Sequence, residues 1–212
     1  MPLFITPIVI NIKNHLILRA KHKTMQQQTI NIRAAEKSDA TTIAHAVAIA
    51  IGDENALRNY CGEDYTTLLK QIAESEKSQY SYLNALIAEI NGKTAGAIIG
   101  YDGAMLNELR AGTFSIINNA LERTPCIPDE TEAGEFYIDS IAVLPEYRGM
   151  GIGKQLITVI RDKALSDGHA RVGLIVDFDN PRAESLYTSL GFTRVGTRIF
   201  FGHKMWHMQY IK

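Results

Sequence analysis

The stretch "PEYRGMGIGKQ" (residues 145–155) contains three glycines at alternating positions, 149, 151 and 153, between Arg148 and Lys154. Glycine has no side chain, so the backbone of such a segment can come close to a ligand. A helix that begins there directs its free amide groups and the positive end of its dipole into the same space. The stretch therefore predicts an anion-binding loop that opens a helix.

Two nucleotide-binding motifs resemble this loop but are excluded by single residues. The dinucleotide fingerprint G-x-G-x-x-G needs a glycine where the chain has Lys154. The phosphate-binding loop G-x-x-x-x-G-K-[ST] needs a glycine in place of Arg148 and a hydroxyl in place of Gln155. A tight strand-to-helix turn without a ligand does not need this many glycines with flanking cations. The pattern that remains is R-x-x-G-x-G, formed by Arg148, Gly151 and Gly153.

The segments around the loop alternate between strand and helix patterns. "EFYIDSIAV" (135–143) is typical of a strand, and apolar residues recur at helical spacing over 152–164. "RVGLIV" (171–176) is an apolar run typical of a strand that is covered on both faces. We therefore expect a strand, a crossover helix and a parallel strand. A short helix follows, with Asn180 as its cap and Gly191 as its end.

The rest of the chain adds further elements on both sides of this unit. Strand patterns occur at residues 29–35, 84–90, 93–101, 193–201 and 206–211. Helix patterns occur at residues 40–51, with Ser38 as the cap, at 65–77, and around Leu106 to Leu121. Asn91-Gly92 supplies the positive backbone angles of a tight hairpin turn. Residues 102–134 form an insert longer than a usual connection, and the fold class is α/β with a mixed sheet.

Composition limits the classes of function. The chain has 212 residues, 46% hydrophobic and 21% charged, as expected of one globular domain. A net charge of −1 gives no sign of bulk attraction to nucleic acid or to an anionic membrane. Cys61 and Cys126 build neither a disulfide framework nor a metal-binding pair, so we expect a cytoplasmic protein.

Residues 1–24 have a composition of their own, with four basic residues and no Asp or Glu. The apolar run "LFITPIVINI" precedes these charges, which is the reverse of a signal peptide, and it is too short to span a bilayer. We expect a non-catalytic extension ahead of a domain over residues 25–212. An arm that binds a membrane surface or a partner is the alternative.

Two longer stretches carry a resemblance to a known family. "FYIDSIAVLPEYRGMGIG" (136–153) and "NPRAESLYTSLGF" (180–192) resemble the GNAT superfamily of N-acetyltransferases. The resemblance implies a twisted, mostly antiparallel sheet of the acyl-CoA N-acyltransferase type, with a central parallel β-α-β unit and helices on both faces. In that family the glycine loop holds the pyrophosphate of acetyl-coenzyme A. The residues implied for cofactor binding are Ile141, Ala142, Val143, Arg148, Gly149, Met150, Gly151, Ile152, Gly153, Lys154, Asn180 and Tyr187.

Acetyl transfer to an amine needs a base, because an alkyl ammonium with a pKa of about 10.4 carries its proton at neutral pH. Asp139 is the first candidate, since the family often has an acidic residue at the matching position of this strand. Strand alternation places Glu135, Tyr137, Asp139 and Ile141 on one face, which makes Glu135 the second candidate. Removal of the proton by solvent, with Asp139 as a binding group, stays open.

The departing thiolate needs a proton, and the resemblance assigns its donation to Tyr187. A phenol with a pKa of about 10 is a reasonable donor to a thiolate whose acid has a pKa of about 8.5. Core packing is the alternative role for a tyrosine on an apolar helix face. A backbone amide near Ile141 is expected to stabilise the negative charge on the thioester oxygen.

The resemblance predicts direct attack of an amine on acetyl-coenzyme A in a ternary complex, without a covalent acetyl-enzyme, because both cysteines lie outside the matched stretches. The sequence leaves open whether the acceptor is a small amine, an amino acid, an antibiotic-like amine or a protein N-terminus, and it also leaves a homodimer open. His203 and His207 lie in a strand pattern, so no metal is expected, and the acidic run at 129–135 is either solvated or steers a cationic amine. A non-catalytic acyl-coenzyme A sensor is the alternative function.

Overall fold

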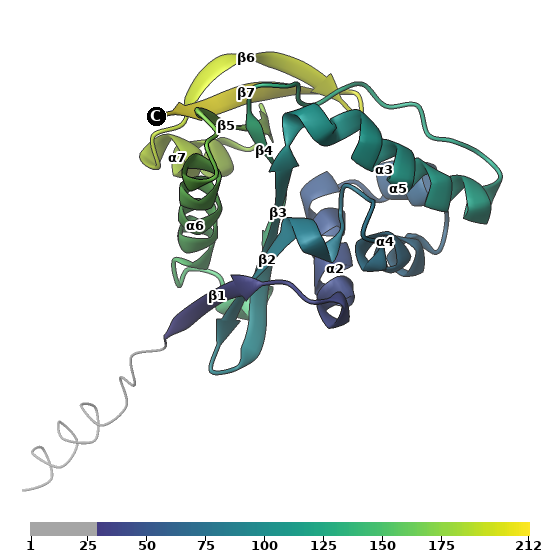
Figure 1. Ribbon diagram of the computed structural model, residues 1–212, viewed down its shortest axis with the longest axis horizontal. Helices are drawn as coiled ribbons and strands as arrows, with labels where there is room; N and C mark the ends of the chain where they lie inside the picture. Colours follow the sequence, from purple (N-terminus) through teal and green to yellow (C-terminus); the bar gives the residue numbers. More distant parts are fainter. Residues whose placement is uncertain (1–28) are drawn as a thin grey trace, which may run out of the picture.

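The computed structural model describes residues 29–212, so the predicted extension over residues 1–24 lies outside the described residues. A seven-stranded sheet in the order β1-β2-β3-β4-β5-β7-β6 forms the centre of the domain (Figure 1). The strands are β1 (Ile30–Ala34), β2 (Ala85–Ile90), β3 (Lys93–Asp102), β4 (Phe136–Val143), β5 (Arg171–Asp177), β6 (Thr193–Phe200) and β7 (His203–Ile211). Neighbouring strands are antiparallel except β4 and β5, which are parallel. The predicted mixed sheet with a central parallel unit is confirmed.

Helices cover both faces of the sheet (Figure 1). They are α2 (Ala40–Ile51), α3 (Glu54–Cys61), α4 (Tyr65–Glu74), α5 (Leu106–Leu121), α6 (Ile152–Ser166) and α7 (Pro181–Ser189). One core joins α2, α3 and α4 to the sheet, and the other joins α6 and α7 to the opposite face. The helical spacing of the apolar residues of α6 explains its position, because Ile152, Leu156 and Ile160 are all buried in the second core. No helix within residues 29–212 has the length and apolar character needed to cross a membrane.

The start of α2 differs from the prediction. Asp39, not Ser38, is the residue that precedes α2, and it ends a short 3₁₀ turn over Lys37–Asp39. Its carboxylate accepts hydrogen bonds from the backbone of Glu36 at 2.8 Å and from Arg33 at 2.7 Å. A carboxylate that serves a backbone amide and a guanidinium together is held more firmly than a serine hydroxyl in the same turn.

The Asn91-Gly92 hairpin is confirmed, with φ of 52° and 72° at its two turn residues. Helix α3, in contrast, was not predicted. It has only eight residues, Glu54–Cys61, and its start depends on the Asp53 side chain, which accepts a hydrogen bond from the amide of Ala56 at 2.6 Å. Short helices of this kind are marginal alone and depend on packing, here through Leu57 and Tyr60.

An irregularity in β4 changes which of its side chains share a face. Ile99 of β3 pairs with Ser140, whereas Gly100 pairs with Ile138, so Asp139 is an extra residue in the strand. Ile138 and Ile141 both pack on the α6 side, although their spacing is odd. The prediction that Ile141 shares a face with Asp139 was therefore wrong, because a bulge reverses the alternation that follows it.

Strands β4 and β5 stay together only briefly. Their parallel pairing is confined to Phe136 with Val172 and Tyr137 with Gly173. Beyond Tyr137 the two strands separate, and the backbone of β4 no longer has β5 as its neighbour. The separation opens the space in which the candidate site lies.

The insert predicted over residues 102–134 packs closely against the rest of the domain. A Cβ atom on Gly112 of α5 would lie 1.9 Å from the carbonyl oxygen of Lys77, so only glycine permits this approach. Thr113 accepts a hydrogen bond from the buried amide of Gln79 at 3.0 Å, and Arg110 is only 7% exposed. The insert is thus a structural part of the domain.

Candidate active site

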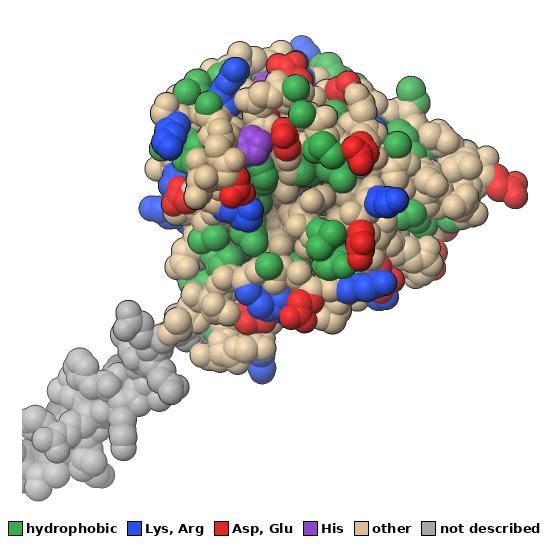
Figure 2. Space-filling view, in the orientation of Figure 1, with side chains coloured by type: hydrophobic (Ala, Val, Ile, Leu, Met, Phe, Trp, Pro, Cys, Tyr) green, Lys and Arg blue, Asp and Glu red, His purple; other side chains and the backbone are tan. Residues whose placement is uncertain are grey.

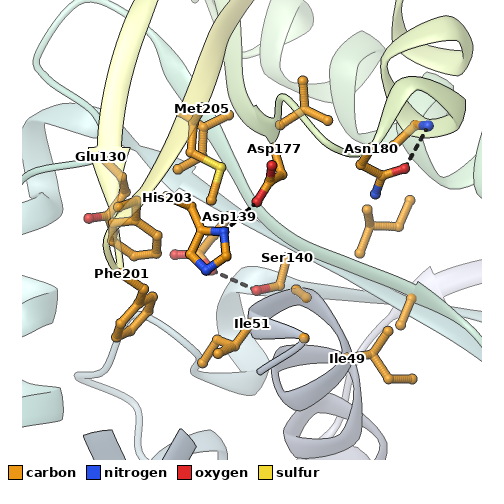
Figure 3. A pocket seen from close by; sticks show the side chains of 18 of the residues that line it. Ile49, Ile51, Glu130, Asp139, Ser140, Asp177, Asn180, Phe201, His203 and Met205 are labelled. Atoms are coloured by element: carbon orange, nitrogen blue, oxygen red, sulfur yellow. Dashed lines mark hydrogen bonds and ion pairs between the residues drawn. The ribbon is translucent and has the colours of Figure 1, made fainter. Parts of the chain in front are cut away.

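A cavity of about 680 Å³ lies where β4 and β5 separate. Residues from α2, β4, β5, α7 and the β6–β7 hairpin line it. Figure 3 shows Asn180 at one end of the cavity and Glu130, Asp139 and Phe201 around the other. Acidic and basic side chains are interspersed over the face of the domain drawn in Figure 2, in keeping with a net charge of −1.

The structure brings about half of the predicted cofactor-binding residues to the cavity lining. These are Ile141, Ala142, Val143, Gly153, Asn180 and Tyr187. The others are exposed: Arg148, Gly149, Met150 and Gly151 form the loop that leads into α6, and Lys154 lies in the first turn of the helix. Ile152 differs from both groups, because its side chain is 1% exposed and belongs to the core. Only the backbone of Ile152 is available to a ligand.

The three loop glycines serve different purposes. Gly149 and Gly151 both have φ of +80°, a conformation that side chains disfavour, so the turn itself requires glycine there. Gly153 has ordinary helical geometry, and a Cβ atom on it would approach other atoms no closer than 3.8 Å. The packing of the protein therefore does not explain Gly153. The space beside Gly153 belongs to the cavity. Gly153 lies in the first turn of α6, where the first amides of a helix have no partner within it, an arrangement that suits an anionic group.

Asn180 begins α7 as predicted. Its Oδ1 accepts a hydrogen bond from the amide of Ala183 at 3.1 Å, and Pro181 follows at the first helical position. The cap uses the oxygen of the amide group only, while the residue also lines the cavity. Its Nδ2 group is thus a donor that the cap does not occupy.

Tyr187 lies on α7 and lines the same cavity. Its ring packs edge-on against Phe192 at a centroid distance of 6.1 Å, and the residue is 8% exposed. Burial raises the pKa of the Tyr187 phenol to about 12. The phenol is therefore fully protonated at neutral pH, and it is a weaker acid than its ordinary pKa indicates.

Asp139 lines the cavity from the bulge of β4. Its Oδ2 accepts a hydrogen bond from the Tyr101 hydroxyl at 2.9 Å, and its Oδ1 accepts one from Ser140 at 2.8 Å. Burial raises the pKa of Asp139, while these two hydrogen bonds and the charge of Arg110 oppose the rise. The carboxylate is consequently a stronger base than an exposed aspartate.

Glu130 is a second carboxylate in the cavity lining, and it is 2% exposed. It forms an ion pair with Arg110 and accepts a hydrogen bond from Gln79 at 3.0 Å. Burial and the nearby charge of Asp139 raise its pKa, against the opposing effect of Arg110. The sequence placed Glu130 only within the acidic run, and nothing in the pattern distinguished it from Glu132, which is exposed.

Glu135, the second base candidate, lies outside the cavity lining. It is 2% exposed, and its carboxylate accepts hydrogen bonds from Thr131 at 2.6 Å and Gln209 at 2.6 Å and pairs with His207 at 2.9 Å. Gly173 makes room for it, because a Cβ atom there would lie 1.9 Å from Glu135 Oε2. Burial alone would raise the pKa of Glu135, but the hydrogen bonds from His207, Thr131 and Gln209 lower it. The group is an ionised link between β4 and β7.

Aromatic side chains surround the end of the cavity that holds the two carboxylates. Tyr80, Tyr137, Phe200 and Phe201 all belong to the lining. Phe201 has φ of 46° at the tip of the β6–β7 hairpin, and its ring packs against Tyr60 at a centroid distance of 5.7 Å. Sequence reasoning missed Phe200 and Phe201 as cavity residues, because the strand pattern gives no sign that the hairpin tip reaches α3.

Comparisons with known proteins agree with this geometry. The model of the acetyltransferase (GNAT) family matches residues 53–192. A crystal structure described as that of an acetyltransferase is 32% identical, with a TM-score of 0.73, and the match covers 85% of this chain and 98% of that one.

Two curated relatives match over shorter lengths. The N-alpha-acetyltransferase RimI of Mycobacterium tuberculosis is 31% identical over 112 residues, which are 51% of this chain and 54% of the relative. A mycothiol acetyltransferase of Arthrobacter sp. is 47% identical over 72 residues, 34% of this chain and 21% of the relative. The chain thus spans about half of the first relative and about a fifth of the second.

Proposed function

The chain belongs to the acetyltransferase (GNAT) family, and we propose that it transfers the acetyl group of acetyl-coenzyme A to a primary amine by direct attack in a ternary complex. One observation carries the proposal. Asp139 of β4 and Tyr187 of α7, one able to take a proton and the other to donate one, line a single cavity. Acetyl transfer to an amine needs both proton movements at one place.

The loop from Arg148 to Lys154 and the start of α6 would hold the diphosphate of acetyl-coenzyme A. Positive φ at Gly149 and Gly151 shapes the loop, and the open space over Gly153 admits the ligand. The backbone of Ile141 to Val143, which β5 leaves unpaired, would bond the pantetheine arm together with Asn180. Acetyl-coenzyme A supplies the thioester.

The proton transfers follow from the positions of two side chains. The acceptor ammonium gives one proton to Asp139, and the neutral nitrogen then forms the bond to the carbonyl carbon as the carbon–sulfur bond breaks. Tyr187 donates its phenolic proton to the departing sulfur. The attacking nitrogen carries two protons after the new bond forms, and the amide product keeps one, so the other returns to Tyr187. The products are an N-acetyl amine, the free thiol of coenzyme A and one proton, which Asp139 releases to solvent.

A covalent acetyl-cysteine is disfavoured by the positions of the cysteines. Neither Cys61 nor Cys126 is among the residues that line the cavity. Cys61 is 1% exposed, and burial raises the pKa of its thiol to about 12, so it is not a nucleophile at neutral pH. Direct attack by the amine needs neither residue.

The lining also supports a class of acceptor. Five acidic residues line the cavity, Asp53, Glu130, Asp139, Asp177 and Asp179, whereas within residues 29–212 no lysine or arginine does. An acceptor with a carboxylate beside its amine would find no lysine or arginine to pair with there. The proposed acceptors are therefore small amines without a neighbouring carboxylate, or a protein N-terminus.

Calorimetric titration with acetyl-coenzyme A tests the cofactor site directly. Gly153→Leu fills the open space without backbone strain, so we expect acetyl-coenzyme A binding to weaken at least about tenfold, or about 1.4 kcal/mol. Gln155→Leu is the matched control, because residue 155 is exposed in the same turn of α6. The wild type and both variants are then assayed for release of free thiol with three acceptors: spermidine, tyramine and a tripeptide with alanine at its N-terminus. No binding by the wild type would overturn the proposal, and binding without thiol release would favour an acyl-coenzyme A sensor.

A further inference from the structure

The Tyr101 hydroxyl lies between two carboxylates that come from different parts of the chain. It is 2.9 Å from Asp139 Oδ2 and 3.4 Å from Glu130 Oε1. A phenol has one hydrogen, so it donates to one of these oxygens at a time. Both carboxylates also line the cavity. Tyr101 therefore connects two acidic groups that face the same ligand space.

Glu130 is held in this position from behind. Arg110 of α5 forms an ion pair with it, and Arg110 is itself fixed by Asp129 and by the carbonyl oxygen of Pro128 at 3.2 Å. Gln79 adds a hydrogen bond of 3.0 Å to Glu130 Oε1. These contacts keep the carboxylate beside Tyr101, although it is carried by the segment between α5 and β4.

The charges around Asp139 are few. The titratable groups that face it from the packed elements are Tyr60, Tyr80, Tyr101, Tyr137, Glu130 and Arg110. Burial raises the pKa of each of these tyrosines far above neutrality, so they stay uncharged. Asp177, His203 and Tyr187 also line the cavity, and Asp177 pairs with His203 at 2.9 Å. Glu130 and Arg110 are therefore the charged groups among the six that face Asp139.

Two carboxylates in one buried site resist being ionised together, because each negative charge disfavours the other. A shared donor such as the Tyr101 hydroxyl couples them further, so that a proton taken up belongs to the pair. One arginine offsets the two charges only in part. The pair therefore gains its first proton more readily than either carboxylate would in water.

We propose that Glu130 is a positioning residue of the acetyl-transfer site, where it shares with Asp139, through the Tyr101 hydroxyl, the proton that the acceptor amine gives up. This inference rests on the proposed function and extends it to a residue of the insert. In the form that accepts the proton, both carboxylates are ionised and the amine is an ammonium. After it the amine is neutral, and one proton is held between Asp139 and Glu130 until solvent removes it.

The geometry predicts opposite effects for two variants of nearly unchanged shape. Glu130→Gln removes a negative charge near Asp139, so Asp139 should titrate at a pH lower by about one unit or more. Tyr101→Phe removes a hydrogen bond to ionised Asp139, so Asp139 should titrate at a higher pH. Glu132→Gln removes the same charge from an exposed position of the same segment and should leave the titration unchanged.

Carbon-13 NMR of the full chain labelled at the aspartate carboxyl carbons measures this titration without an acceptor, and Asp139→Asn assigns the signal. The pH profile of kcat/KM, at saturating acetyl-coenzyme A, should move in the same direction for each variant. An Asp139 titration that is the same in wild type and Glu130→Gln would overturn the inference, as would equal shifts in Glu130→Gln and Glu132→Gln. If Glu130→Gln does not fold, the Tyr101→Phe variant provides the test: an Asp139 titration at the same or a lower pH than in the wild type would overturn the inference. Failure to bind acetyl-coenzyme A would remove the proposed function but leave the NMR result readable.

Discussion

The two ends of the cavity are built from different parts of the protein. At one end, Gly153 lines the cavity behind the exposed loop over Arg148 to Gly151, and the features that can bind a ligand there are backbone amides and the space beside Gly153. At the other, Asp139, Glu130 and Tyr101 are side chains from separate segments, surrounded by aromatic rings. The loop depends on backbone angles set within a few residues. The carboxylate end depends on packing between elements far apart in the chain.

Because of this difference, the two ends should tolerate different amino-acid substitutions. An anion bound by amides is insensitive to most side chains of the loop, and it is lost when a side chain fills the space that the backbone leaves. A buried carboxylate, in contrast, depends on each partner, since removal of one hydrogen bond or charge alters its proton affinity. We therefore expect substitutions at the loop to change cofactor affinity and substitutions around Asp139 to change turnover.

The largest effect on turnover is expected for Asp139, at the carboxylate end of the cavity. Asp139→Asn removes the proposed base and keeps the size of the side chain, so kcat should fall about 10²–10⁴-fold. The affinity for acetyl-coenzyme A, measured by calorimetry, should stay within about twofold of the wild type. An unchanged kcat would mean that solvent removes the proton and that Asp139 only binds the acceptor.

A smaller effect is expected for Tyr187, which lines the cavity from α7. Tyr187→Phe should lower kcat about 10²-fold, because the thiolate loses its proton donor, while acetyl-coenzyme A affinity changes little. Steady-state kinetics and calorimetry measure the two quantities separately. A loss of affinity with unchanged kcat would instead assign Tyr187 to packing of the pantetheine arm.

The smallest effect concerns a carboxylate that lies outside the cavity. Glu135→Gln should lower the free energy of unfolding by about 1–3 kcal/mol, because buried donors on Thr131, His207 and Gln209 lose an ionised acceptor. Urea unfolding measures it, with Glu132→Gln as the control for removal of a charge. A large loss of kcat at unchanged stability would contradict this assignment and return Glu135 to the catalytic candidates.

The pH dependence of this stabilisation has a definite sign. Hydrogen bonds keep the pKa of Glu135 in the folded state below the unfolded value of about 4.3. The contribution is therefore complete above that pH and is lost as the pH falls through the lower, folded-state pKa. Urea unfolding at pH 3 and pH 7 should show a smaller difference between wild type and Glu135→Gln at pH 3.

The sequence alone determined the features that depend on neighbouring residues. The glycine loop, the Asn91-Gly92 hairpin, the Asn180 cap and helix α5 were all predicted where the structure has them. Positive φ, capping and apolar periodicity are local properties, so they can be recognised in a single sequence.

Only the tertiary structure decided the face of β4 and the partners of the carboxylates. The bulge at Asp139 reverses the alternation predicted for Ile141, and it arises from pairing with β3. Tyr101 is 38 residues from Asp139 and 29 from Glu130 in the chain, yet one hydroxyl joins them. Glu130 and Glu135 belong to the same acidic run, and packing alone directs one to the cavity and the other to β7. Spacing along the chain carries no record of these contacts, because they depend on how distant segments fill a common interior.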